Sequence, residues 1–135
     1  MRIVPLTLLP LILYNLVAFL FDQGRGTAVW TASLAEAAMP SGAVWVLPLG
    51  DVLVTLAILL LFVEVLKSTR STSSVLLDHG LSTLVLLIYL GEFLIVPAAS
   101  TSTFFILLII ALVDVLAGAT VTIRAARRDI AFDRN

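Results

Sequence analysis

Cysteine is absent from this sequence of 135 residues, and histidine occurs once, as His79. Without cysteine the chain can form no disulfide, no thiol redox pair and no thiolate metal site, which excludes iron–sulfur chemistry. A single histidine also excludes a bis-histidine haem and a zinc site built from histidine and cysteine within one chain. The sequence therefore predicts no cofactor and no metal.

Charge is scarce, and neither sign dominates. Only 13% of the residues are charged, with eight Lys and Arg against nine Asp and Glu, which gives a formal net charge of −1. An average soluble domain carries roughly 25% charged residues. So few basic residues cannot line a groove that follows a phosphate backbone, which excludes nucleic acid as a partner.

Catalytic signatures are missing as well. The chain has no glycine-rich phosphate loop, no nucleophile elbow and no H-E-x-x-H motif. Ser82 has only His79 as a candidate base, and our interpretation of this serine is a hydroxyl that packs between helices. We therefore expect a protein without catalytic activity of its own.

Apolar residues are in excess: 61% of the chain is hydrophobic and the mean hydropathy is +1.15. A helix needs about 20 mostly apolar residues to cross a hydrocarbon core about 30 Å thick. Because lipid offers no hydrogen-bond partner to the backbone, such segments must be helical. The sequence predicts one all-α domain over residues 1–135, an integral membrane four-helix bundle. Its four spans cover residues 3–21, 43–66, 75–97 and 103–123.

The basic residues predict the orientation of these spans. Lys and Arg accumulate on the cytoplasmic side of membrane proteins, and in a four-span arrangement only Arg25 lies on the other side. We expect both termini to be cytoplasmic, in a multi-pass protein of a bacterial inner membrane. The residues on the cytoplasmic side are Arg2, Lys67, Arg70, Arg124, Arg127, Arg128 and Arg134.

The loop between the first two spans predicts a short helix in the outer interface, over residues 28–39. Trp30, Leu34 and Ala37 recur at helical spacing, and Pro40 and Gly42 end the pattern. We expect Trp30 to lie at the depth of the lipid headgroups, as tryptophan often does. The further headgroup contacts predicted are Trp45, Arg124, Arg127 and Arg128, with a simple topology signal as the alternative explanation of these arginines.

Polar side chains inside the spans need a reason, because an acid at the centre of a span costs about 2.5–3.5 kcal/mol on insertion scales. In the third span the polar residues fall on one helical stripe, which must face protein or water. Glu92 lies at the outer end of this stripe, and Asn15 of the first span is a plausible donor to it. The stripe consists of Asp78, Ser82, Val85, Tyr89, Glu92 and Val96.

The fourth span carries Asp114 among small residues, Ala111, Gly118 and Thr122, which predicts a face that packs against another helix. In the second span Asp51 is the acid expected to point inward. Counted from the predicted ends of the spans, Glu92, Asp51 and Asp114 lie about 8, 12 and 17 Å below the outer boundary. We expect these acids to form a descending set.

Three interpretations of this set stay open: a hydrogen-bonded network that fixes helix packing, a path for protons or cations, and a contact with a polar residue of another subunit. His79 is a possible proton relay, with an ordinary headgroup or hydrogen-bond contact as the alternative. Glu64 lies three residues before Lys67, which suggests an ion pair at the membrane surface.

These observations lead to one expectation about function and two alternatives. Nearly the whole chain is expected in the membrane, so we expect a subunit, assembly factor or oligomeric module that acts through helix–helix contacts. Its partners would be the lipid bilayer and other membrane chains, in a homo- or hetero-oligomer. The alternatives are a small transporter or channel coupled to protons or cations through its intramembrane carboxylates, and a protein that binds lipid or pigment between its helices.

Overall fold

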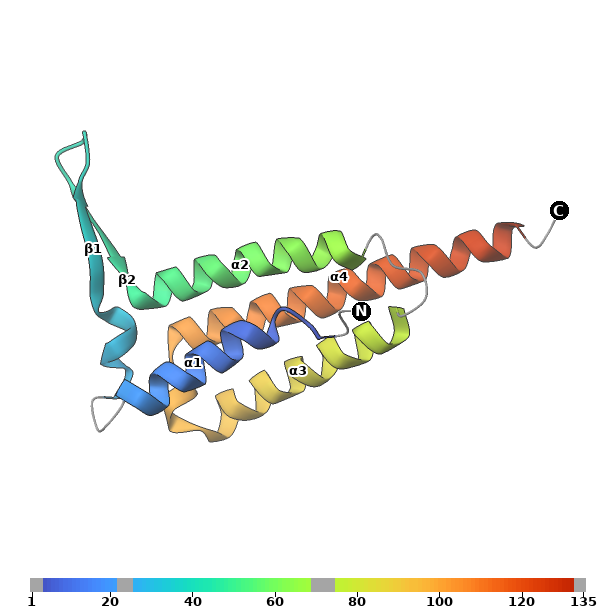
Figure 1. Ribbon diagram of the computed structural model, residues 1–135, viewed down its shortest axis with the longest axis horizontal. Helices are drawn as coiled ribbons and strands as arrows, with labels where there is room; N and C mark the ends of the chain where they lie inside the picture. Colours follow the sequence, from blue (N-terminus) through green and yellow to red (C-terminus); the bar gives the residue numbers. More distant parts are fainter. Residues whose placement is uncertain (1–3, 22–25, 69–74, 133–135) are drawn as a thin grey trace.

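The computed structural model describes residues 4–21, 26–68 and 75–132, and this part of the chain is mostly helical (Figure 1). The α-helices run up and down in an antiparallel bundle, and a β-hairpin projects from one end of it. The elements are α1 (Leu8–Phe21), the 3₁₀ helix η1 (Gly26–Thr31), β1 (Ser33–Ala38), β2 (Val44–Pro48), α2 (Leu49–Ser68), α3 (Val75–Ile95), the 3₁₀ helix η2 (Pro97–Ala99) and α4 (Ser102–Phe132). We name the two ends of the bundle the hairpin end and the α2–α3 end.

Three of the helices are long and apolar enough to cross a membrane, over Leu49–Ser68, Leu77–Ile95 and Ser102–Val121. α3 agrees with the predicted span except for its last two residues. α4 continues nine residues beyond the predicted end, because Ala and Arg, which dominate that stretch, favour the helix. Three of the four predicted spans therefore correspond to helices that are long and apolar enough to cross a membrane.

The first helix is shorter than predicted. α1 has 14 residues, about 21 Å of helix against a core of about 30 Å. It begins at Leu8 rather than at residue 3, after two tight turns in which Leu8 N–H and Leu9 N–H bond the carbonyl oxygens three residues earlier. Pro10 falls in the first turn of the helix, where its missing N–H breaks no hydrogen bond. α1 therefore covers only the half of the bundle nearest the hairpin (Figure 1).

α4 packs against both α2 and α3, and small residues bring the helices close together. Ala57 on α2 and Ala111 on α4 are each 1% exposed. At the hairpin end, a Cβ added to Gly50 would lie 2.5 Å from Thr103 Oγ1 and 3.0 Å from the backbone oxygen of Trp30. Glycine is needed where α2 meets the start of α4 and η1, because these two segments leave no room for a side chain at position 50.

The predicted interfacial helix over residues 28–39 is wrong, since the segment divides between the end of the 3₁₀ helix η1 and the strand β1 (Ser33–Ala38). β1 pairs antiparallel with β2, and residues 39–43 join the two strands. Met39 N–H bonds Ala43 O at 2.8 Å, which leaves Pro40, Ser41 and Gly42 as the loop. Gly42 has a φ of 85° and donates its N–H to Met39 O, the pattern of a three-residue hairpin loop. Val44, Trp45 and Val46 favour a strand, and pairing with them overrode the helical propensity of the alanine-rich segment. For the same reason α2 begins at Leu49, not at residue 43.

The outward faces of the four α-helices are largely apolar where the side chains are described. Large hydrophobic side chains are exposed along each helix, where a soluble bundle would carry charge. Such a surface is typical of helices that meet lipid. Examples are Phe19 on α1, Phe62 on α2, Leu94 and Ile95 on α3 and Leu116 on α4.

Candidate functional site

The centre of the site is Asp114, which is 5% exposed and lies on the inward face of α4. It follows Ser102, the start of α4, by twelve residues, about 18 Å of helix. Thr7 donates a hydrogen bond from its hydroxyl to Asp114 Oδ2 at 3.3 Å. Ser82 on α3 lines the same pocket as Asp114. Asp114 therefore joins α4 to the chain just before α1.

Glu64 is the second buried acid of the site, although the sequence predicted it at the membrane surface. It is 4% exposed and close enough to Asp114 for the two carboxyl groups to repel each other. The predicted pair with Lys67 does form, with Lys67 Nζ 3.0 Å from Glu64 Oε1. The other carboxylate oxygen accepts the backbone N–H of Leu6 at 3.2 Å.

One signal in the sequence could have found Glu64. It shares a helical face with Gly50, Leu53 and Ala57, and these are the buried residues of α2. Small residues on a face allow close helix packing, so this face was the better candidate for the interior. Glu64 was instead expected at the membrane surface, because it lies near the end of the predicted span and three residues before Lys67.

The two acids hold the beginning of α1 inside the bundle. The first N–H groups of a helix lack partners within the helix and carry a partial positive charge, which a carboxylate stabilises. Here Leu6 N–H bonds Glu64, and Tyr89 on α3 donates from its hydroxyl to Thr7 O at 3.0 Å. The backbone before α1 is therefore bonded to side chains of α2 and α3.

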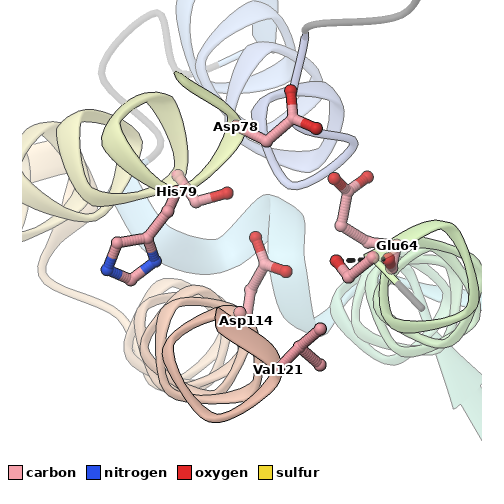
Figure 2. A pocket seen from close by; sticks show the side chains of 8 residues that line it. Glu64, Asp78, His79, Asp114 and Val121 are labelled. Atoms are coloured by element: carbon pink, nitrogen blue, oxygen red, sulfur yellow. Dashed lines mark hydrogen bonds between the residues drawn. The ribbon is translucent and has the colours of Figure 1, made fainter. Parts of the chain in front are cut away.

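A small pocket lies beside these acids, towards the α2–α3 end. Its volume is about 20 Å³, enough for a bound water molecule. Figure 2 shows the Asp114 carboxyl group pointing into the space between the helices, while the His79 ring turns aside, next to α4. The lining residues are Glu64, Ser68, Asp78, His79, Ser82, Asp114, Gly118 and Val121.

His79, the predicted proton relay, does not touch Asp114 directly. Its Nδ1 atom is buried and has no hydrogen-bond partner among the described residues, and the backbone of Gly118 lies beside it, leaving 3.4 Å between Nδ1 and an added Cβ. His79 and Asp78 enter the pocket from the first turns of α3 (Figure 2). The pocket therefore gathers carboxyl groups from three helices and one imidazole.

Glu92 belongs to a separate cluster at the hairpin end. Asn15 donates from its amide to Glu92 Oε2 at 2.7 Å, as the sequence suggested. Next to this pair, the Tyr14 hydroxyl donates to Ala98 O at 2.7 Å, and its ring stacks on Trp30 with a centroid distance of 4.2 Å. Tyr14 was not among the predicted site residues, because a tyrosine in an apolar helix carries no distinctive pattern.

Asp51 is exposed, so the expected descending set of Glu92, Asp51 and Asp114 does not form. Because residues 44–48 are a strand, Asp51 lies in the first turn of α2 and not two turns below its start. An acid in the first turn is stabilised by the helix dipole. The face it shares with Thr55, Ile58 and Phe62 is also exposed, which is opposite to the prediction.

The remaining residues of the predicted site are buried or exposed, or their side chains lie outside the described part of the structure. Ala111 is buried and Gly118 half-buried, on the inward side of α4, whereas the side chain of Thr122 lies outside the described residues. Trp30 is only 4% exposed and is not a headgroup contact, because η1 turns it onto Tyr14, whereas Trp45 is 51% exposed. The side chains of Arg124, Arg127 and Arg128 also lie outside the described part.

Within residues 4–21, 26–68 and 75–132, no three His, Asp or Glu side chains gather as a metal site would require. The geometry of the pocket can bind water and hold or exchange a proton. No protein family, characterised protein or solved structure matches this chain.

Proposed function

We propose that the chain is a small, non-catalytic, multi-pass membrane protein that works as a subunit, assembly factor or oligomeric module. In this proposal the four helices lie in a bacterial inner membrane, with the α2–α3 end and both termini on the cytoplasmic side. The exposed apolar faces of the helices support a membrane location. Lys67, near the end of α2, supports the orientation.

The proposal rests on one observation: the polar side chains that point into the bundle form hydrogen bonds with other parts of the same chain. Asp114 bonds Thr7, Glu64 bonds Leu6 and Lys67, and Glu92 bonds Asn15. Hydrogen bonds between helices are common means of holding a bundle together in lipid. The surfaces on which a partner could dock are therefore the apolar outer faces of the helices and the hairpin.

The test is native mass spectrometry of the full chain released gently from membranes. We expect the chain in a defined complex, with further copies of itself or with another membrane chain at a fixed ratio. A single chain carrying only lipid, under conditions that preserve a known membrane oligomer measured in parallel, would contradict the proposal. A reporter fused to the C-terminus tests the orientation separately.

The pocket favours a second function, proton transfer through the membrane. It is lined by the two buried acids and by His79, whose buried Nδ1 has no hydrogen-bond partner within the described part of the chain. Protons move through such chains of groups and water in pumps and transporters. Vesicles that contain the purified chain should then dissipate an imposed pH gradient faster than empty vesicles.

The variants Asp114→Asn and Glu64→Gln should abolish this proton flux while the protein still folds. Asp51→Asn is the matched control, since Asp51 is exposed and lies at the other end of α2. If the parent protein dissipates the gradient no faster than empty vesicles, proton transfer is excluded. If Asp51→Asn removes the flux equally, the pocket is not the path.

A further inference from the structure

The β-hairpin projects from the bundle and is largely exposed. All six residues of β1 are exposed, and so are Val44, Trp45 and Val46 of β2. An isolated two-stranded hairpin is only marginally stable in water, and this one carries a single charged residue, Glu36. Its exposed apolar side chains therefore require an environment other than water alone.

The two faces of the hairpin differ. Paired residues share a face, and faces alternate along a strand. One face carries Glu36 opposite Val46 and Ala38 opposite Val44. A register irregularity between Ser33 and Ala35 places Ser33 opposite Pro48, on the same side as Glu36, and the Ser33 hydroxyl bonds Glu36 at 3.3 Å. The other face consists of Ala35, Ala37, Trp45 and Leu47, without a polar side chain. We call them the Glu36 face and the Trp45 face.

The position of the hairpin is set by its attachment. β2 ends at Pro48 and α2 begins at Leu49, whose N–H bonds Ala32 O at 3.0 Å, so the base of the hairpin is bonded across to the start of the helix. From there the hairpin extends sideways, across the direction of the helices (Figure 1). If α2 crosses the membrane, a sideways element at its first residue lies along the membrane surface.

We propose that the hairpin rests on the outer leaflet, with the Trp45 face inserted among lipid headgroups and upper acyl chains and the Glu36 face in water. This inference rests on the proposed membrane location of the bundle. Tryptophan is enriched at this depth because its ring is apolar and its N–H needs a polar partner. The free backbone groups of the strand edges can bond water and headgroups there, unlike in the hydrocarbon core.

Spin labels provide the test, because a chain without native cysteine can be labelled at one chosen position. Ala37→Cys and Ala38→Cys are a matched pair, adjacent alanines on opposite faces of β1. Each labelled protein is reconstituted in phosphatidylcholine and phosphatidylglycerol vesicles. Collisions with oxygen, which concentrates in lipid, are compared with collisions with a water-soluble nickel chelate.

We expect the label at position 37 to report a depth of about 5–10 Å below the headgroups, as for interfacial segments, and the label at 38 to report water. Equal access of the chelate to both labels would place the hairpin in water and overturn the inference. Shielding of both labels from both reagents would mean that a protein surface, such as a second copy, covers the hairpin, and would also overturn it. A reversal of the two faces would overturn it as well.

Failure of this inference is distinguishable from failure of the proposed function. Extraction of membranes at alkaline pH shows whether the chain is integral. An integral chain whose two labels are equally exposed to the chelate refutes the hairpin proposal alone. A chain released into the alkaline supernatant refutes the membrane location, and the hairpin proposal with it.

Discussion

The two ends of the bundle contain polar clusters of similar chemistry but different packing. At the hairpin end, the pair of Asn15 and Glu92 lies beside aromatic rings, with Tyr14 stacked on Trp30 and edge-on to Phe104. At the α2–α3 end, Glu64 and Asp114 adjoin a pocket with room for water. Both clusters make hydrogen bonds between segments of the bundle, and the second also adjoins space for a bound water molecule.

The difference follows from the length of α1. At the hairpin end all four α-helices are present, and large rings fill the space between them. Towards the α2–α3 end α1 has not yet begun, and the chain before it is held by Glu64, Asp114 and Tyr89. Without α1, the interior at this end has fewer apolar side chains to fill it. Polar side chains and a small pocket occupy the space instead.

The largest effect is expected at the hairpin end, from Tyr14→Ala. Removal of a large buried aromatic side chain typically costs about 3–5 kcal/mol, and here it also removes the hydrogen bond to Ala98 O. The free energy of unfolding, measured by denaturant titration in mixed micelles, should fall accordingly. Tyr14→Phe keeps the ring and should lose about 1 kcal/mol. Equal losses in the two variants would show that the ring stack contributes little.

At the α2–α3 end, Glu64→Ala should cost less, about 1–3 kcal/mol, because it leaves the partly buried N–H of Leu6 without its acceptor. The loss should concentrate in α1, whose amide hydrogens should exchange faster than those of α3. Glu64→Gln keeps an oxygen acceptor and should retain most of the protection. If α1 is equally protected in Glu64→Ala, the acid does not hold the start of that helix.

Single hydrogen bonds should have smaller effects, and these compare the two clusters directly. Bonds between membrane helices contribute about 0.6 kcal/mol on average and at most about 1.7 kcal/mol. Asn15→Leu removes an amide donor 2.7 Å from Glu92 Oε2, whereas Thr7→Val removes a hydroxyl donor at the longer distance of 3.3 Å from Asp114 Oδ2. We expect the larger loss of unfolding free energy from Asn15→Leu. The reverse order would show that the pocket end depends more strongly on its hydrogen bonds.

The smallest effect is expected from Trp45→Ala on the hairpin, within about 0.5 kcal/mol for the bundle, since Trp45 packs against none of the core. Trp30→Ala is the control, because Trp30 is buried on Tyr14 and its loss should resemble that of Tyr14→Ala. The same unfolding titration measures both. A large loss from Trp45→Ala would mean that the hairpin supports the bundle.

Much of the fold could be predicted because long apolar helices depend on local composition. α3 and α4 begin within one residue of the predicted positions. The hairpin could not be predicted with the same ease, since β1 is stabilised by residues 44–48 and not by its own alanine-rich sequence. The start of α1 was missed because it depends on acids from α2 and α4, more than fifty residues away.

For the candidate site, the sequence by itself determined the spacing of polar residues along each helix. In α3 that spacing brings Ser82, Val85 and Tyr89 to one face, and all three are buried. Tertiary structure decided how α2 is rotated, with Glu64 inside and Asp51 outside. The physical reason is that the rotation of a helix depends on which face its neighbour can approach. Gly50 and Ala57 let α4 approach the face that carries Glu64, and charge alone did not indicate that face.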